Sequence, residues 1–199
     1  MPTNTLAFLM ATVRRFHHAG IHLWVSGGWA EELWQMTPPR PHHDIDLLYQ
    51  AASFQTLDRV IVAESAFIDI PPKRFSHKRA VTYNGVMLEF VLVQGTAPHH
   101  ITKFFDDRYL MHWPADTFDH SLQVEQCVIA VASCAALAQY RQSHTAIAQA
   151  YAALLETRET EQRHVIKPPI QTIQASAYER LPPNTPLQPT ASRARSWLF

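Results

Sequence analysis

The sequence predicts an α+β fold: a small mixed β-sheet with helices packed on it, followed by a mainly helical C-terminal part. Segments with helical spacing of apolar residues alternate with short runs of β-forming residues. Asn84-Gly85, a strong hairpin signal, lies between two such runs, 74–83 and 86–93. Hydrophobic residues make up 47% of the 199 residues, enough to build a core.

In the N-terminal half, the first helix is expected over 5–18, with Gly20 as a stop. The remaining elements expected there are a strand at 21–25, a short helix at 29–36 that ends before three prolines, a strand at 44–49, a helix at 54–64 capped by Ser53, and a strand at 67–70.

The second half begins with the hairpin, whose strand 86–93 is apolar on both faces and is therefore expected to be central. Residues 94–120 are expected to form a mixed loop with aromatic anchors. A strand is expected at 128–131, a helix from about residue 133, and a further helix over 145–163. We expect a core at 1–120, a helical part of the same domain at 121–166, and a disordered, proline-rich tail at 167–199.

The composition excludes some functions. Seventeen Lys and Arg residues balance seventeen Asp and Glu residues, so no basic excess indicates a protein that coats nucleic acid. No apolar run of about 18 residues predicts a membrane span, and no signal peptide is recognised. Two cysteines do not make a disulfide framework. We therefore expect a cytoplasmic protein without a nucleic-acid or membrane partner.

Two short motifs carry candidate chemistry. Ser26-Gly27-Gly28 lies between a predicted strand and helix, where glycines permit close backbone approach and N–H groups can face an anion. Asp44 and Asp46 alternate on a predicted strand and so share one face, about 7 Å apart. Such carboxylates repel unless a cation lies between them, and a pair of Mg²⁺ ions fits that need. The alternatives are a structural turn and a solvent-facing edge strand.

A third candidate is Glu89, a single carboxylate in an apolar strand, which is costly unless it is paired or binds metal. If its strand lies beside that of the two aspartates, three carboxylates meet. The alternative is an ion pair with a basic residue of the hairpin: Arg74, Lys78 or Arg79. A two-residue turn places Ala80 opposite Glu89, with Lys78 as the diagonal neighbour, while Arg79 points to the other face.

Taken together, these motifs resemble the aminoglycoside and lincosamide nucleotidyltransferases, a branch of the DNA polymerase β-like superfamily. The superfamily carries Gly-Gly or Gly-Ser, a helix, and then Asp-x-Asp. The resemblance rests on Trp-Val-Ser-Gly-Gly-Trp-Ala at 24–30 and Arg-Pro-His-His-Asp-Ile-Asp-Leu at 40–47. Trp-Ala after the glycines and Arg-x-His before the first aspartate are specific to this branch. The match is close over 21–49 and continues loosely to about 165.

The resemblance implies a Mg²⁺-dependent enzyme that moves a nucleoside monophosphate, expected to be AMP from ATP, to a hydroxyl of a small molecule. Two Mg²⁺ ions are expected. The implied metal-binding and catalytic residues are Asp44, Asp46 and Glu89, with Glu89 able to act as general base. The nucleotide-binding candidates are Ser26, Gly27, Gly28, Arg40 and His42.

Some questions stay open from the sequence. For Arg40, the two expected roles are a phosphate contact and a structural salt bridge. For His42, they are a contact with the nucleotide phosphates and a structural role in its loop. Relatives usually carry Asp where Glu89 stands, and a downstream charged motif is missing, so the acceptor is open; an aminoglycoside- or lincosamide-like antibiotic is one expectation. The alternatives are a protein-modifying nucleotidyltransferase of the toxin–antitoxin type and a nucleotide-binding module with weak turnover. The oligomeric state is not predicted.

Overall fold

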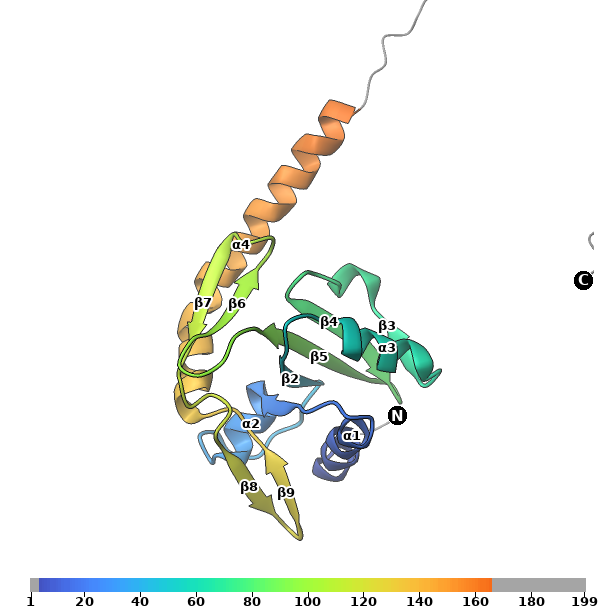
Figure 1. Cartoon of the computed structure of the whole chain (residues 1–199), viewed down its shortest axis with the longest axis vertical. Helices are drawn as coiled ribbons and strands as arrows, with labels where there is room; N and C mark the ends of the chain where they lie inside the picture. Colours follow the sequence, from blue (N-terminus) through green and yellow to red (C-terminus); the bar gives the residue numbers. More distant parts are fainter. Residues whose placement is uncertain (1–3, 166–199) are drawn as a thin grey trace, which may run out of the picture.

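The centre of the protein is a five-stranded mixed sheet with the order β1-β2-β5-β4-β3 (Figure 1). We describe residues 4–165 of a computed structural model. The strands are β1 (Trp24–Ser26), β2 (Asp44–Gln50), β3 (Phe67–Asp69), β4 (Lys78–Tyr83) and β5 (Val86–Val93). β2 and β5 are parallel, and the other neighbours are antiparallel. The predicted mixed sheet, with Glu89 on its central strand, is confirmed, whereas the tail predicted at 167–199 lies outside the described residues.

Two helices pack on one face of this sheet. The helical elements are α1 (Leu6–His18), α2 (Gly27–Leu33), α3 (Gln55–Ala63), the 3₁₀ turn η1 (Pro71–Lys73) and α4 (Cys134–Val165). On α1, the ring of Phe16 lies 5.1 Å from that of Phe67 and 5.2 Å from that of Phe90. On α3, Asp58 pairs with Arg79 of β4 at 2.8 Å. Both contacts belong to the same sheet face.

The opposite face carries the candidate carboxylates. Because side chains alternate along β5, Phe90 faces α1 while Glu89 points away from it. The parallel register pairs Leu47 with Phe90 and Asp46 with Glu89. Asp44 therefore shares the face of Asp46 and Glu89, opposite α1 and α3.

The β4–β5 hairpin has the predicted turn and register. Asn84 and Gly85 have φ angles of 47° and 76°, and the two-residue turn that matches strand twist requires positive φ at both positions. Ala80 pairs with Glu89 as expected. Arg79 lies on the helix-covered face, also as expected.

The prediction of a mixed loop at 94–120 is wrong, because this segment contains a second hairpin, formed by β6 (His100–Phe104) and β7 (Tyr109–Trp113). Its turn uses positive φ angles at Phe105, Asp106 and Asp107, of 51°, 56° and 63°. Asp106 and Asp107 are turn-forming residues that tolerate this conformation, but Phe105 rarely adopts it, and no hairpin was predicted here. Trp113 Nε1 anchors the hairpin by donating to Thr102 Oγ1 at 2.9 Å.

The C-terminal part begins with a third hairpin, β8 (Ser121–Val124) and β9 (Cys127–Ala130), and continues into α4. The helices expected from about residue 133 and over 145–163 are one continuous helix, whose distal half extends beyond the body of the molecule (Figure 1). Tyr140 stacks on Trp113 with 5.9 Å between ring centroids, which fixes α4 to β7. Within residues 4–165, no helix combines the length and apolarity needed to cross a bilayer.

The packing predicts which side chain stabilises the sheet. Phe90 is fully buried beneath α1, so Phe90→Ala should lower the free energy of unfolding by about 3–5 kcal/mol through a cavity and lost contacts. Chemical denaturation measures this change. Val62→Ala is the control, because Val62 is 85% exposed and should change stability by less than about 0.5 kcal/mol. Equal losses in both variants would contradict the packing.

Candidate functional site

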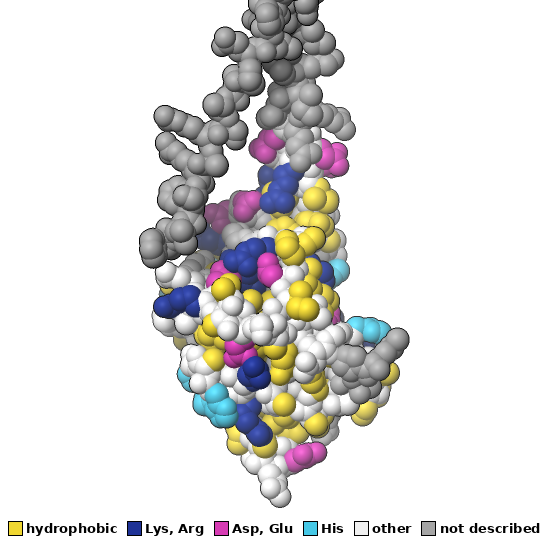
Figure 2. Space-filling view, turned by 90° about the vertical axis from the view of Figure 1, so that its right-hand side faces the viewer, with side chains coloured by type: hydrophobic (Ala, Val, Ile, Leu, Met, Phe, Trp, Pro, Cys, Tyr) yellow, Lys and Arg dark blue, Asp and Glu magenta, His cyan; other side chains and the backbone are white. Residues whose placement is uncertain are grey.

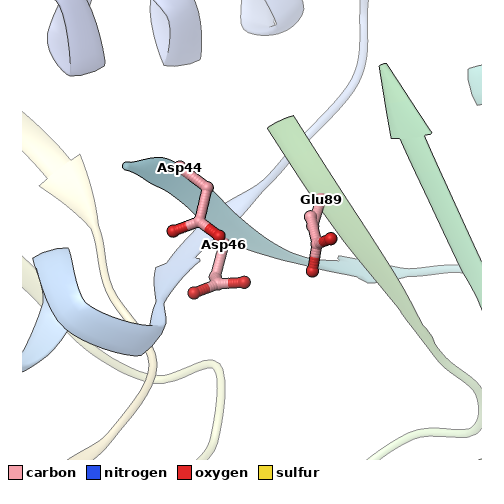
Figure 3. Close-up of side chains that lie close together, drawn as sticks. All are labelled: Asp44, Asp46 and Glu89. Carbon is pink, nitrogen blue, oxygen red and sulfur yellow. The ribbon is translucent and has the colours of Figure 1, made fainter. Parts of the chain in front are cut away.

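Three carboxylates converge on the open face of the sheet. Asp44 and Asp46 project from β2, and Glu89 projects from the neighbouring β5 toward the same side (Figure 3). One oxygen atom from each lies within 4.8 Å of the others. The structure thus brings together the three residues that the sequence predicts for metal binding and catalysis.

The surroundings of Asp46 disfavour its ionised form. Burial, the nearby Asp44 and the nearby Glu89 together raise the pKa of Asp46 to about 7. The positive charges of Lys78 and Lys73 oppose this shift but do not cancel it. Asp46 is therefore the carboxylate whose ionised form most needs an additional cation.

Glu89 has two cationic partners of its own. Lys73 Nζ of η1 lies 2.6 Å from Glu89 Oε1, and Lys78 of β4 pairs with Oε2. Burial raises the pKa of Glu89, but these hydrogen-bonded ammonium groups outweigh it and hold the pKa below its usual value. Lys78 is the diagonal neighbour expected from the hairpin, whereas Lys73 was not predicted. Glu89 therefore forms ion pairs with lysines and also belongs to the carboxylate cluster, so both interpretations are correct.

The glycine turn lies directly against the carboxylates. Ser26 ends β1 opposite Asp46, and Gly27 follows with a φ of +58°. A Cβ on Gly27 would lie 2.0 Å from Asp46 Oδ2, so no other residue fits without displacing that carboxylate. The hydroxyl of Ser26 does not cap α2.

Arg40 and His42 hold the loop before β2 against α2. His42 Nε2 lies 2.8 Å from Glu32 Oε2, and its ring lies 4.1 Å from that of Trp29. Arg40 pairs with Glu31 at 3.5 Å and keeps 53% of its side chain exposed. The loop-holding alternative thus describes His42, while the exposed guanidinium of Arg40 remains able to reach a ligand.

α4 closes the site from the side opposite the sheet. Tyr140 lines a small hollow with Ser26, Gly27 and Asp46. Burial and the charges of Asp46 and Glu89 raise the pKa of Tyr140 to about 12, so the side chain stays a neutral phenol. No local motif in the sequence identifies Tyr140 or Lys73, because both reach the site only through tertiary folding.

The donor set fits Mg²⁺. The three side chains offer only oxygen ligands, which this hard cation prefers, and their spacing suits one ion or a close pair. Burial, followed by the charges of Asp44 and Glu89, raises the pKa of Asp46 despite the two lysines, so a divalent cation there would favour its ionised form. Asp44, Asp46 and Glu89 are the residues that would hold such ions.

Asp46 should make the stability of the metal-free protein depend on pH. Its pKa is about 7 when folded and about 4 when unfolded, so the folded chain keeps a proton that the unfolded chain loses in this window. Stability therefore falls as the pH rises from about 4 to about 7. Asp46→Asn, which cannot ionise, should be more stable than wild type at about pH 8, by up to about 4 kcal/mol.

Thermal unfolding in EDTA at about pH 4 and pH 8 measures this difference, which should nearly vanish at the lower pH. The control is Asp119→Asn, an exposed aspartate outside the site. The same gain for Asp46→Asn at both pH values would contradict the assigned cause.

Comparisons with known proteins agree with this geometry. The crystal structure of the lincosamide antibiotic adenylyltransferase LnuA with bound lincomycin matches with a TM-score of 0.58 and 14% identity, over 75% of this chain and 98% of that one. The crystal structure of ANT(2'')-Ia in complex with adenylyl-2''-tobramycin matches with a TM-score of 0.52 and 13% identity, over 79% of this chain and 92% of that one. At these identities, the similarities show the fold.

Sequence comparisons identify the family. A search of curated proteins finds no match. The family profile of aminoglycoside-2''-adenylyltransferase matches residues 8–162, which include the glycine turn, all three carboxylates and most of α4. This chain therefore belongs to the aminoglycoside-2''-adenylyltransferase family and is a nucleotidyltransferase.

Proposed function

We propose that the protein is a Mg²⁺-dependent adenylyltransferase that moves AMP from ATP to a hydroxyl of a small molecule. The observation that carries this proposal is the convergence of Asp44, Asp46 and Glu89 beside the Ser26-Gly27-Gly28 turn. Carboxylates in this arrangement suit the paired metal ions of in-line phosphoryl displacement, and the glycine turn packs directly against Asp46, His42 and Arg40.

The acceptor class is supported by the family and by the structural neighbours. The family description names adenylyl transfer to the 2'' position of aminoglycosides, and the two neighbours contain lincomycin and adenylylated tobramycin. A hydroxyl-bearing antibiotic is therefore the first kind of acceptor to test.

Each residue has a distinct task in this reaction. The backbone at Ser26, Gly27 and Gly28 positions the β- and γ-phosphates of ATP. Asp44, Asp46 and Glu89 would hold Mg²⁺, which would supply positive charge to neutralise the charge that develops on the phosphate oxygens.

Glu89 accepts the proton of the acceptor hydroxyl. The hydroxyl oxygen then forms a bond to the α-phosphorus as the bond to pyrophosphate breaks. The products are the adenylylated acceptor, pyrophosphate and a proton carried by Glu89.

Arg40 and His42 act from the loop before β2. The Glu32 carboxylate and the Trp29 ring orient His42, which keeps the loop against α2. Arg40 can exchange its long contact with Glu31 for a phosphate oxygen, since guanidinium groups match phosphate geometry.

Removing either aspartate should abolish transfer. Asp44→Asn and Asp46→Asn each delete a negative metal ligand and should lower pyrophosphate release from ATP at least about 100-fold. Calorimetry should show weaker Mg²⁺ binding as well. Asp119→Asn, with the same chemical change at an exposed site, should keep full activity. Unchanged transfer and metal binding in both site variants would refute the mechanism.

Two substitutions at Glu89 distinguish the effect of its negative charge from the effect of its side-chain length. Glu89→Gln removes the proton acceptor and should lower kcat by about 10²–10⁴-fold. Glu89→Asp keeps the charge but shortens the side chain by one methylene, so the loss should be smaller, up to about 10²-fold. Single-turnover AMP transfer measures both. If the Gln variant were as active as the Asp variant, Glu89 would not be the base.

A further inference from the structure

The hollow beside Asp46 is bounded by two segments that are far apart in the sequence. Ser26 and Gly27, where β1 turns into α2, lie on one side of it, and Tyr140 of α4 lies on another. Its volume is about 20 Å³, which is room for one water-sized group and too little for a nucleobase or a sugar ring. The hollow therefore fits a single ligand atom, such as an oxygen.

Two hydroxyl groups border this hollow and are free to donate a hydrogen bond. Ser26 is 4% exposed, and its hydroxyl does not cap α2. Within residues 4–165, neither this hydroxyl nor that of Tyr140 has a hydrogen-bond partner. The other side chains around the hollow are aliphatic, apart from the carboxylate of Asp46. Ser26 and Tyr140 are therefore the hydroxyl donors that an oxygen in the hollow would meet.

Tyr140 is held in place as a neutral donor. Its ring stacks on that of Trp113, with 7° between the ring planes, and lies 6.5 Å from the ring of Phe104. Both of these neighbours are buried. Burial, followed by the charges of Asp46 and Glu89, raises the pKa of Tyr140 to about 12. The phenol therefore keeps its hydrogen at neutral pH and can donate it.

A phosphate oxygen suits this position better than a neutral oxygen. Hydrogen bonds from a hydroxyl to an ionised oxygen are about twice as strong as those between neutral groups. The hollow adjoins Ser26 and Gly27, the turn that the proposed function assigns to the β- and γ-phosphates. The carboxylate of Asp46 would repel a phosphate oxygen unless a divalent cation lay between them, which is the arrangement that the carboxylate cluster suits.

The molecular surface in Figure 2 offers no rival position for these phosphates. Among the described residues visible on that face, Lys and Arg side chains are interspersed with Asp and Glu side chains and form no extended basic patch. The hollow between the glycine turn and α4 is therefore favoured over that face for the phosphate groups.

We propose that Tyr140 donates a hydrogen bond to a phosphate oxygen in the pyrophosphate part of ATP, beside the hydroxyl of Ser26. This inference rests on the proposed function and adds a residue of α4 to its nucleotide-binding residues. When the bond between the α-phosphorus and the bridging oxygen breaks, its electron pair stays with pyrophosphate, which gains negative charge. Tyr140 keeps its own proton, and its hydrogen bond stabilises the leaving group more than the bound substrate.

Tyr140→Phe tests this assignment, because it removes the hydroxyl and keeps the ring that stacks on Trp113. Calorimetry with the full-length protein and Mg²⁺ measures the binding of pyrophosphate. The variant should bind pyrophosphate about 10- to 100-fold more weakly than wild type, since a hydrogen bond to a charged group is lost. Affinity for AMP, which lacks this part of ATP, should change less than about twofold. Single-turnover AMP transfer should also be slower.

Tyr151→Phe is the matched control. Tyr151 is another tyrosine of α4, but it is 40% exposed and contacts Phe75 and Phe105. Its substitution should leave pyrophosphate binding unchanged, and thermal unfolding confirms that both variants are folded.

Three results would overturn the role of Tyr140: wild type does not bind pyrophosphate, Tyr140→Phe binds it as tightly as wild type, or Tyr140→Phe loses AMP affinity to the same extent. The proposed function fails separately, if the wild type binds MgATP and pyrophosphate but transfers AMP to no hydroxyl acceptor.

Discussion

Three like charges held on two neighbouring strands are the constraint on which the site depends. The parallel register of β2 and β5 places Asp46 opposite Glu89, and strand alternation adds Asp44 to the same face. Their mutual repulsion is not relieved by distance, because the strands are fixed by a core that includes the fully buried Phe90. It must therefore be relieved by positive charge, by a proton or by a metal ion. In the metal-free protein, the positive charges of Lys73 and Lys78 relieve the repulsion at Glu89, and the raised pKa of Asp46 favours a bound proton there.

The backbone around the carboxylates follows from the same constraint. β1 must lie close enough to β2 for the chain to turn into α2 above Asp46, and only Gly27 leaves room for the carboxylate at that point. The loop that returns from α2 to β2 is held by the contact between His42 and Glu32. The polar parts of the site are thus positioned by rigid elements on one side, while Lys73 arrives from a short 3₁₀ turn on the other.

Much of this arrangement could be predicted because its signals are local. Asn84-Gly85 sets the hairpin register, and that register places Glu89 and its neighbour Lys78 correctly. Asp-x-Asp on a strand needs no tertiary information to share a face. By contrast, the β6–β7 hairpin turns through Phe105, Asp106 and Asp107, all in a left-handed conformation. The aspartates tolerate this conformation, but no local signal predicts it for Phe105. Lys73 and Tyr140 enter the site only because separate segments fold together.

Glu89 joins two sides of the site that carry opposite charge. The metal-binding side of Glu89, on β2, must stay acidic for the chemistry. The other side is formed by η1 and β4, whose lysines bond to Glu89 and whose charges also act on Asp46. In this chain that side is cationic, with Lys73 and Lys78 on the same carboxylate. Because Lys73 and Lys78 bond to Glu89 and lower its pKa, a substitution there changes the proton affinity of a proposed metal ligand and base, so the two sides of Glu89 are coupled.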